Sequence, residues 1–430
     1  MVSMRDVLKG NVLILTLGTS LRALSLFITF PYFSLYVRAL GGSNVAIGIV
    51  TALSPLAAMF VYPIAGALSE SYSRVRILVV VGALNAGLYL VYTLAPDWRF
   101  LAAANFINGL MVFQFPATSS LLADSMDPNL RGRGYAVLSA IPSFIGILTP
   151  FAGAYLIDVL GLIPAMRVLY AITVAALTVI TLLNWRFLEE TRSKEPSPRS
   201  DLPRIAAGAY RSLLETVRWM PRNLKFYAVM LVLAFFFNSL TGPYWVLYAG
   251  DVRGISVLDW GSILTVSTLI QVVMTMPAGA LIDRYDTKKI TALAAGLSAF
   301  PILAFPFLRG FWLVLMAFIP ISVANAFLIP AANALMVELV PQERRGMVMA
   351  TLGRGMLLTN YRGGVGGGPG MGFVLTLPVV VGSLMSGYIY DAVPSAPWLL
   401  LGSALVVNAV IAAFFLKTEE ESDGSPSEAR

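Results

Sequence analysis

The sequence contains neither cysteine nor histidine. The absence of cysteine excludes structural disulfides and thiolate nucleophiles, and the absence of histidine excludes imidazole acid–base catalysis. Zinc, haem and iron–sulfur centres usually depend on these residues as ligands, so we expect no metal and no cofactor. With no acid in the middle of any long apolar run either, we do not expect an enzyme.

Charged residues are also scarce. They make up 12% of the 430 residues, whereas 57% are hydrophobic. A soluble domain usually carries about 25% charged residues. The apolar residues gather in runs of about 18 or more, which is long enough to cross a bilayer. The composition therefore predicts an integral membrane protein and not one large soluble core.

Twelve apolar segments follow one another along the chain. Inside a bilayer the backbone has no water to bond, so each segment is expected to be a helix and the fold all-α. Two charges precede the first long apolar run, which lacks a small-residue cleavage signature, so we expect a retained first span. The predicted spans are 12–37, 44–68, 77–95, 100–123, 135–157, 168–188, 226–249, 260–282, 290–308, 311–337, 373–390 and 397–416.

Lysine and arginine are distributed unevenly between the two sides of these spans. With the N-terminus inside, 24 of the 30 basic residues fall in cytoplasmic segments and five in outer loops. This positive-inside bias predicts a multi-pass protein of the cell membrane with both termini cytoplasmic. It also explains the net charge of +7 without nucleic-acid binding, and the lipid bilayer is the expected partner.

A polar segment divides the spans into two groups of six. Residues 189–224 form the expected cytoplasmic linker, in which 213–220 is predicted to be a short amphipathic helix on the membrane surface. The expected domains are an N-terminal six-helix bundle over 1–188, a C-terminal bundle over 225–416 and a cytoplasmic tail over 417–430.

The two groups of spans repeat each other. Pro31-Tyr32 returns as Pro243-Tyr244, 212 residues later. Further pairs are Gly48 with Gly261, Gly66 with Gly279, Asp124 with Glu338, and, after an insertion, Gly153 with Gly387. Two like halves with parallel topology are one plan of secondary transporters, in which the substrate site lies at their interface near mid-membrane.

The insertion lies between the tenth and eleventh spans, at about residues 347–372, and has seven glycines in the ten positions 363–372. It lacks the Gly-Lys-Ser/Thr ending of a phosphate loop. We expect a flexible cytoplasmic connector. A substrate gate or hinge is one alternative, and entry of residues 346–358 into the membrane as part of the eleventh helix is another.

A charged break follows the second span and recurs in the second half. It reads Gly66-x-x-x-Glu70-x-x-x-Arg74-x-Arg76 and resembles motif A of the major facilitator superfamily. The likeness covers nearly the whole chain. It implies twelve transmembrane helices in two pseudo-symmetric six-helix bundles.

A second pattern lies in the fifth span. Gly146-x-x-Thr149-Pro150-x-x-Gly153 is similar to the Gly/Pro motif of antiporters in this superfamily, with threonine in place of one glycine. Together with the repeated Pro31 pattern, it implies the drug- and metabolite-exporter branch.

The resemblance also implies a gate at the inner ends of the helices. In the family the motif A acid caps a neighbouring helix and the arginine pairs with an acid at the end of the fourth span, which is Asp124 here. In the second copy Thr287 stands where Arg74 does in the first, and a pair of Lys288 with Glu338 is the alternative. Solvated loop charges that only set topology are the other interpretation. The predicted gating residues are Gly66, Glu70, Arg74, Asp124, Gly279, Asp283, Arg284 and Glu338.

Arg22 is the one charge expected deep within a predicted span. Thr19 and Ser25 share its small, polar helical face. An arginine facing lipid costs at least about 2.5 kcal/mol, so Arg22 is expected to face the bundle interior or a water-filled cavity. It is either an anchor for an anionic or dipolar substrate, or a structural residue bonded by neighbouring helices. Its register counterpart is Ala234, so the arginine pair of organophosphate carriers in the superfamily is absent.

Other polar side chains lie within the spans. With Arg22, Thr19 and Ser25, the candidate substrate-binding residues are Asn108, Asn238, Tyr244, Gln271 and Asn325, and Asn105 lies beside them. Isolated amides in spans also serve as contacts between helices. The aromatic residues Tyr32, Tyr36, Trp245 and Tyr248, near the outer ends of spans, are expected to form an interfacial belt.

The pattern as a whole predicts a secondary transporter that moves a small organic solute by alternating access, as an exporter or antiporter. An organic-anion uniporter or exchanger anchored by Arg22 is an alternative, and a non-transporting membrane receptor is an alternative of another class. The resemblance implies a coupling proton or ion, although no acid lies in mid-span. A monomer is expected.

Overall fold

The computed structural model describes residues 8–126, 131–191, 202–353, 355, 357–363 and 371–416, with side chains for all of these except 66–71, 131–137, 139 and 202–206. This part of the chain is helical apart from short connections and one isolated β-bridge between Gly353 and Met371. It contains 12 helical spans long and apolar enough to cross a membrane. The expected all-α fold with twelve spans is confirmed.

The first half contributes six spans, and the first and fourth of these are interrupted by a 3₁₀ turn. Its elements are α2 (Gly10–Thr29), η1 (Phe30–Tyr32), α3 (Phe33–Ala39), α4 (Asn44–Ser71), α5 (Arg74–Leu94), α6 (Trp98–Leu110), η2 (Met111–Phe113), α7 (Gln114–Asp124), α8 (Arg131–Leu160) and α9 (Leu162–Phe187).

The second half repeats this order with additions. The linker helix α10 (Leu202–Trp219) precedes α11 (Arg222–Thr241), η4 (Gly242–Tyr244), α12 (Trp245–Asp251), α13 (Val257–Ile282), α14 (Thr287–Ala304), η5 (Phe305–Phe307), α15 (Phe311–Leu339), η6 (Gln342–Arg344), α16 (Arg345–Leu352), α17 (Phe373–Ala392), α18 (Ala396–Val410) and the π-helical turn η7 (Ile411–Phe415). The linker helix is longer than the predicted stretch 213–220.

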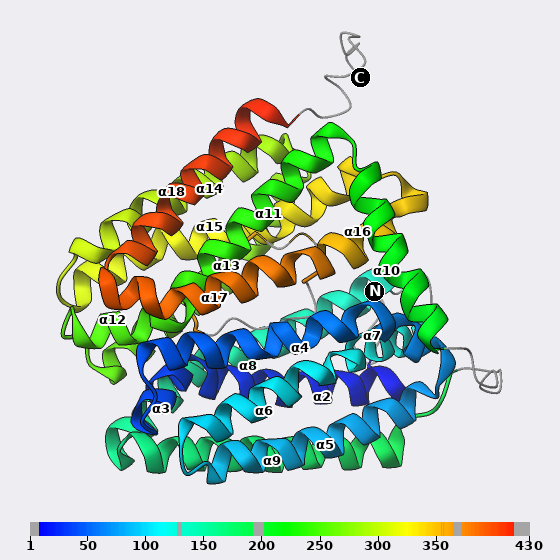
Figure 1. Cartoon of the computed structure of the whole chain (residues 1–430), viewed down its shortest axis with the longest axis horizontal. Helices are drawn as coiled ribbons and strands as arrows, with labels where there is room; N and C mark the ends of the chain where they lie inside the picture. The colour runs from blue at the N-terminus through cyan, green and yellow to red at the C-terminus, as the bar shows by residue number, and fades with distance from the viewer. Residues whose placement is uncertain are drawn as a thin grey trace.

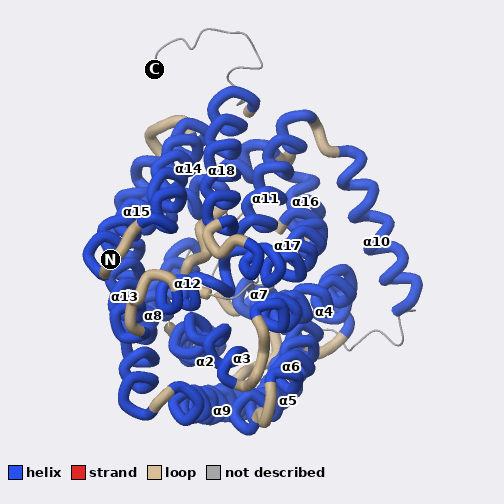
Figure 2. The backbone as a smooth tube through the Cα atoms, turned by 60° about the vertical axis from the view of Figure 1, so that its left-hand side comes forward, coloured by secondary structure: helices blue, strands red, loops and turns tan. Residues whose placement is uncertain are grey.

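Figure 1 shows the two halves side by side, with α4 of the first half lying along α17 of the second. The second contact across the seam joins α8 and α13. By the sequence repeat, α4 corresponds to α13 and α8 to α17, so the two contacts are equivalent. The linker helix α10 lies along the outside of the bundle (Figure 2).

The helices have two common ends. We call the end that holds Gly10 of α2, helix α10 and Leu416 the linker end, and the end that holds Ala39, Asn44 and Asp251 the far end. Large apolar side chains such as Phe144, Trp185 and Met276 are exposed along the outside of the bundle, as the lipid-facing surface of a membrane protein requires.

Proline explains the interruption of the first and seventh spans. Pro31 and Pro243 lie in η1 and η4, where the α-helix tightens to a 3₁₀ turn before it continues. A proline lacks the backbone N–H that an α-helix needs, so it breaks the helix at the same place in both halves. These breaks direct the tyrosines that follow them toward the seam.

Candidate functional site

Two glycines bring α4 and α17 into backbone contact across the seam. A Cβ atom on Gly48 would lie 2.5 Å from the carbonyl oxygen of Ser383, and one on Gly387 would lie 2.4 Å from the Cα atom of Val45. No larger residue fits at either position unless the helices move apart. Small residues allow this kind of close helix packing in membranes, where apolar burial alone does not bring helices together.

The equivalent contact between α8 and α13 is made in the same way. A Cβ atom on Gly261 would lie 2.4 Å from the Cβ atom of Ala154 and 2.9 Å from the hydroxyl oxygen of Tyr32. Gly261 is the repeat counterpart of Gly48. The constant spacing of these glycines in the sequence therefore corresponds to two matching contacts between the halves.

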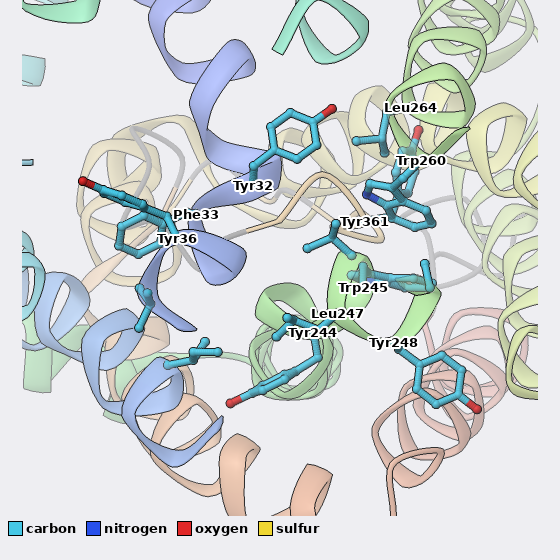
Figure 3. Close-up of a cluster of buried hydrophobic side chains, with 14 of the residues drawn as sticks. Tyr32, Phe33, Tyr36, Tyr244, Trp245, Leu247, Tyr248, Trp260, Leu264 and Tyr361 are labelled. Carbon is cyan, nitrogen blue, oxygen red and sulfur yellow. The ribbon is translucent and has the colours of Figure 1, made fainter. Parts of the chain in front are cut away.

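Four tyrosines stabilise the broken spans at this seam (Figure 3). Tyr32 donates a hydrogen bond to the carbonyl oxygen of Pro150. Its counterpart Tyr244 donates to the carbonyl oxygen of Asn44 in the other half, at 2.8 Å. One turn later, Tyr36 and Tyr248 donate to carbonyl oxygens of the third and ninth spans, at 3.0 and 3.1 Å.

These aromatic side chains do not form an interfacial belt. Tyr32, Tyr36, Trp245 and Tyr248 are at most 1% exposed. They pack in one cluster that includes residues from both halves (Figure 3). The expectation was wrong because these rings pack against other buried rings within the bundle, such as Tyr36 on Tyr170 and Trp245 on Trp398, and do not reach the surface.

Polar contacts complete the closure of the far end. Arg38 at the end of α3 binds both carboxylate oxygens of Asp251 at the end of α12, with 2.8 Å between Nη2 and Oδ1. The amide of Asn44 donates to the carboxylate of Asp391 at 2.7 Å. Both pairs join one half to the other, so the structure shows a state that is sealed at the far end.

The linker end is arranged differently. Its buried apolar residues form two separate clusters, one centred in each half, whereas the cluster at the far end is continuous across the seam. A cavity of about 420 Å³ lies here. It is lined by Tyr62, Pro63, Ala65, Phe115, Pro116, Ser119, Ala209, Ser212, Leu213, Met347, Met349, Ala350, Met371 and Phe373, none of which is charged.

Between the seal and this cavity lies part of the inserted segment. Asn238, near the end of α11 and in the middle of the seventh span, and Asn325, in the middle of α15, hydrogen-bond the backbone of residues 358–360. Gln271 of α13 accepts a hydrogen bond from Arg362. The expectation of a cytoplasmic connector is therefore wrong for 357–363, which lies among the middles of the spans. Residues 364–370 lie outside the described part of the chain.

Arg22 lies inside the first half. Its Nη1 donates to the amide oxygen of Gln114 at 2.9 Å, and its guanidinium lies 5.6 Å from the ring centre of Phe115. The surrounding cavity of about 70 Å³ is lined by α2, α5, α7 and α9 only. Arg22 thus avoids lipid, as expected, and Phe115 lines the larger cavity as well.

The remaining candidates of the first half bond within that half. Thr19 lines the small cavity with Arg22, and its hydroxyl donates to its own helix, as does that of the buried Ser25. Asn105 joins α6 to α4 through the carbonyl oxygen of Val50 at 2.6 Å, and Asn108 lies near the hydroxyl of Tyr89.

Two of the predicted gate residues of the first half meet at the linker end. The guanidinium of Arg74, at the start of α5, forms an ion pair with Asp124 at the end of α7. Glu190 lies beside this pair and accepts hydrogen bonds from Ser73 at 2.5 Å and from the backbone N–H of Val75 at 3.3 Å. A carboxylate at a helix N-terminus is stabilised by the helix dipole. The surroundings of Gly66 and the side chain of Glu70 lie outside the described part of the chain.

The second half holds a weaker copy of this contact. Thr287, the counterpart of Arg74, donates to the carboxylate of Glu338 at 2.8 Å. Lys288 lies 4.0 Å from Asp286, which caps α14. Asp283 and Arg284 are exposed, and a side chain at Gly279 would meet no neighbouring atom within 4 Å.

Comparison with known proteins decides the family. The model of the Major Facilitator Superfamily matches residues 15–353 and 227–430. The chain belongs to the Major Facilitator Superfamily. It is therefore a membrane transporter and not an enzyme, in agreement with its two matching halves.

Curated relatives of this superfamily member include multidrug resistance proteins. MdtG of Salmonella arizonae is 25% identical over 341 residues, which cover 76% of this chain and 80% of that protein. MdtG of Citrobacter koseri is 24% identical over 353 residues, with 80% and 83% covered.

Solved structures of similar fold are also transporters. The nucleoside transporter NupG matches with a TM-score of 0.67 at 14% identity, over 96% of this chain and 100% of that chain. The human organic anion transporter MFSD10 (TETRAN) matches with a TM-score of 0.62 at 17% identity, over 93% and 98%. At these identities the likeness shows the shared fold.

The antiporter-like motif has a structural explanation in this superfamily member. Pro150 cannot bond the carbonyl oxygen of Gly146, and the hydroxyl of Thr149 donates to that oxygen at 3.0 Å instead. A Cβ atom on Gly153 would lie 2.5 Å from the carbonyl oxygen of Ile28, so this glycine allows α8 to approach α2.

Sequence reasoning missed several residues of the site. Arg38 is expected from the sequence only as a basic residue of an outer loop and Arg362 as a cytoplasmic one, and Asp251 is given no role. The signal for Arg38 and Asp251 was their position at equivalent helix ends, 213 residues apart. For Arg362 the only signal was the apolar run that precedes it, which is too short to span a membrane.

Proposed function

We propose that this transporter exports small, mainly apolar organic solutes by alternating access, with its linker end in the cytoplasm. The observation that carries the proposal is the uncharged cavity of about 420 Å³ at the linker end of a molecule sealed at the far end. A volume between about 300 and 1,000 Å³ is typical of small-molecule sites. The likeness to MdtG proteins, named for multidrug resistance, supports the same class of solute.

The lining of the cavity suits varied solutes. Met347, Met349 and Met371 are flexible and polarisable, and Phe115 and Phe373 offer flat apolar faces. Methionine-rich surfaces repack around different ligands, which favours broad specificity. The amphipathic helix α10 contributes Leu213 to this lining, so the linker forms part of the route and does more than connect the halves.

The orientation rests on charge. The basic loops gather at the linker end, and positive charge favours the cytoplasmic side. We therefore propose that the transporter lies in the cell membrane and loads solute from the cytoplasm; that it acts as a monomer stays a prediction. A coupling proton would bind at carboxylates near helix ends, such as Asp124 and Glu338, since the described spans carry no acid near their middle.

The anion-exchange alternative has less support. It depends on Arg22 as an anchor, and the cavity around Arg22 has only about 70 Å³ and lies within one half. A water molecule occupies about 30 Å³ in the liquid, so this space suits a few waters and not an organic anion.

Counterflow in proteoliposomes tests the proposal. We expect exchange of rhodamine 6G and chloramphenicol and none of fluorescein, a doubly charged anion. Met349→Glu should suppress chloramphenicol exchange by introducing a carboxylate into the cavity, whereas Met349→Leu should preserve it. Saturable binding without exchange would instead indicate a receptor, and preferred exchange of fluorescein would favour the anion exchanger.

A further inference from the structure

The inserted segment forms a loop that is closed at its base. Gly353 at the end of α16 and Met371 before α17 form a β-bridge, and a Cβ atom on Gly372 would lie 2.1 Å from the backbone nitrogen of Gly353. The chain therefore leaves and returns at one point beside the cavity. Residues 357–363 extend from there toward the seal, and Tyr361 lies close to the aromatic cluster (Figure 3).

Two asparagines hold the backbone of this segment. Asn238 donates to the carbonyl oxygen of Leu358 at 2.8 Å and accepts from the N–H of Asn360 at 2.7 Å. Asn325 donates to the carbonyl oxygen of Thr359 at 3.0 Å and accepts from its N–H at 2.8 Å. Each carboxamide thus bonds one C=O and one N–H of the two peptide units that flank Thr359, so the segment occupies a defined position on the second half.

The tip of the segment presents an aromatic ring followed by a cation. The ring of Tyr361 is 1% exposed and packs edge-on against Phe318, with 5.3 Å between ring centres. Arg362 donates to the amide oxygen of Gln271 at 2.5 Å, and its guanidinium lies 5.6 Å from the ring centre of Phe27 in the first half. Aromatic faces attract cations, more strongly when water is excluded.

The segment also crosses the seam. A Cβ atom on Gly363 would lie 2.9 Å from the carbonyl oxygen of Phe30 and 3.1 Å from the Cα of Pro31, both in the first half. One short stretch therefore binds α11, α13 and α15 on one side and the broken first span on the other. A solute cannot occupy this position while the segment is there.

The charge of Arg362 is only partly compensated. Within the described part of the chain no carboxylate contacts it, and its partners are one amide oxygen and the aromatic rings of Phe27 and Tyr361. A charge near mid-membrane is costly without a counter-charge. A solute cation making the same contacts can therefore compete with it.

We propose that residues 357–363 are a tethered occupant of a central solute site, which lies between the far-end seal and the cavity, and that the solute which displaces them is an aromatic organic cation. The Phe318 face would receive its ring, and Gln271 with Phe27 its positive charge. This inference rests on the proposed export of organic solutes and names their class. It also assigns Asn238 and Asn325 as the groups that release the segment when solute binds.

Binding of rhodamine 6G, an aromatic cation, to the full-length protein tests the competition. A segment docked for about nine-tenths of the time weakens the apparent affinity about tenfold. Replacing 357–363 by a Gly/Ser sequence of equal length should therefore lower the Kd about tenfold. Tyr361→Ala combined with Arg362→Gln, which keeps the backbone bonds, should shift it in the same direction. An unchanged or increased Kd in both variants would overturn the proposal.

A second readout does not depend on the solute. The chain has no cysteine, so Tyr361→Cys provides a single labelling site. We expect slow maleimide labelling that speeds up at least tenfold in the Asn325→Ala background. Asn333→Ala is the matched control, since Asn333 lies on the same helix and donates only to its own helix at Ile329.

The two readouts separate the two proposals. Tighter dye binding after replacement of the segment supports both the export proposal and the tethered occupant. If no variant binds the dye but labelling speeds up in Asn325→Ala, the docked segment stands and the proposed solute class fails. Equal labelling in the Asn325→Ala and Asn333→Ala backgrounds would contradict the docked segment whatever the dye does.

Discussion

Arg22 shows how a charged residue can be accommodated within a membrane span. Its guanidinium is held by Gln114 and faces Phe115 inside the first half. Hydrogen bonds to charged groups contribute about 1.5–3 kcal/mol, and the amide left behind on removal is itself unsatisfied. These contacts therefore favour a structural role for Arg22 over a role as a substrate anchor.

A double-mutant cycle tests this structural role. Arg22→Ala and Gln114→Ala should each lower the melting temperature. The loss in free energy of unfolding in the double variant should be smaller, by at least about 1 kcal/mol, than the sum of the losses in the two single variants. Arg22→Lys should be intermediate. Strict additivity, or loss of transport with unchanged melting temperature in Arg22→Ala, would favour direct contact with solute.

The two halves make equivalent contacts at the linker end. In the first half Arg74 forms an ion pair with Asp124, and in the second half Thr287 donates a hydrogen bond to Glu338. We expect Arg74→Ala and Asp124→Asn to slow exchange more than they weaken binding, because the pair joins helix ends that separate or approach during cycling. Thr287→Ala should have a smaller effect. Counterflow rates beside equilibrium Kd values provide the comparison, and equal rates in all four proteins would exclude a gate.

Among the elements, the helices and their repeat could be predicted from the sequence. Long apolar runs permit only helices in lipid, and the spacing of Gly48 and Gly261 indicated two like halves. The sequence did not reveal which helices these glycines join, because the contact partners lie more than 100 residues away along the chain. The burial of Tyr32 and Tyr244 at the seam was hidden for the same reason.

The contact between α4 and α17 gives a prediction for this element pair. Gly48→Val places atoms against the backbone at Ser383, so the far end should open more often. A cysteine at Asn44 should then be labelled several-fold faster. Gly87→Val is the control, since a Cβ atom there meets nothing within 4 Å. Unchanged labelling in Gly48→Val would mean that this glycine does not hold the seal.

The segment 357–363 could not be predicted, for physical reasons. It has no helical period, and its position depends on four side chains from distant spans: Asn238, Gln271, Phe318 and Asn325. The glycines that follow it favour a flexible connector on composition alone. The one indication in the sequence was the presence of polar side chains in mid-span, namely Asn238, Gln271 and Asn325. Such side chains need hydrogen-bond partners, and the segment supplies them.

At the scale of the whole molecule, the closed far end is stabilised by apolar packing and by a small number of charged contacts. Arg38 and Asp251 are 37% and 42% exposed, and an exposed pair contributes about 0–1 kcal/mol. Arg38→Ala should therefore raise the far-end-open population by up to about fivefold. The difference in this population between Arg38→Ala and the wild type should become smaller at high salt, because salt already screens the ion pair in the wild type.

The most direct test of alternating access is a pair of spin-label distances measured on the same protein. Labels at Tyr72 and Tyr285, equivalent exposed positions at the linker end, report one side, and labels at Leu94 and Phe307 report the far end. During turnover with rhodamine 6G we expect the linker-end distance to shorten while the far-end distance lengthens. Two distances that stay fixed, or that lengthen together, would contradict a transporter whose halves rock about a central site.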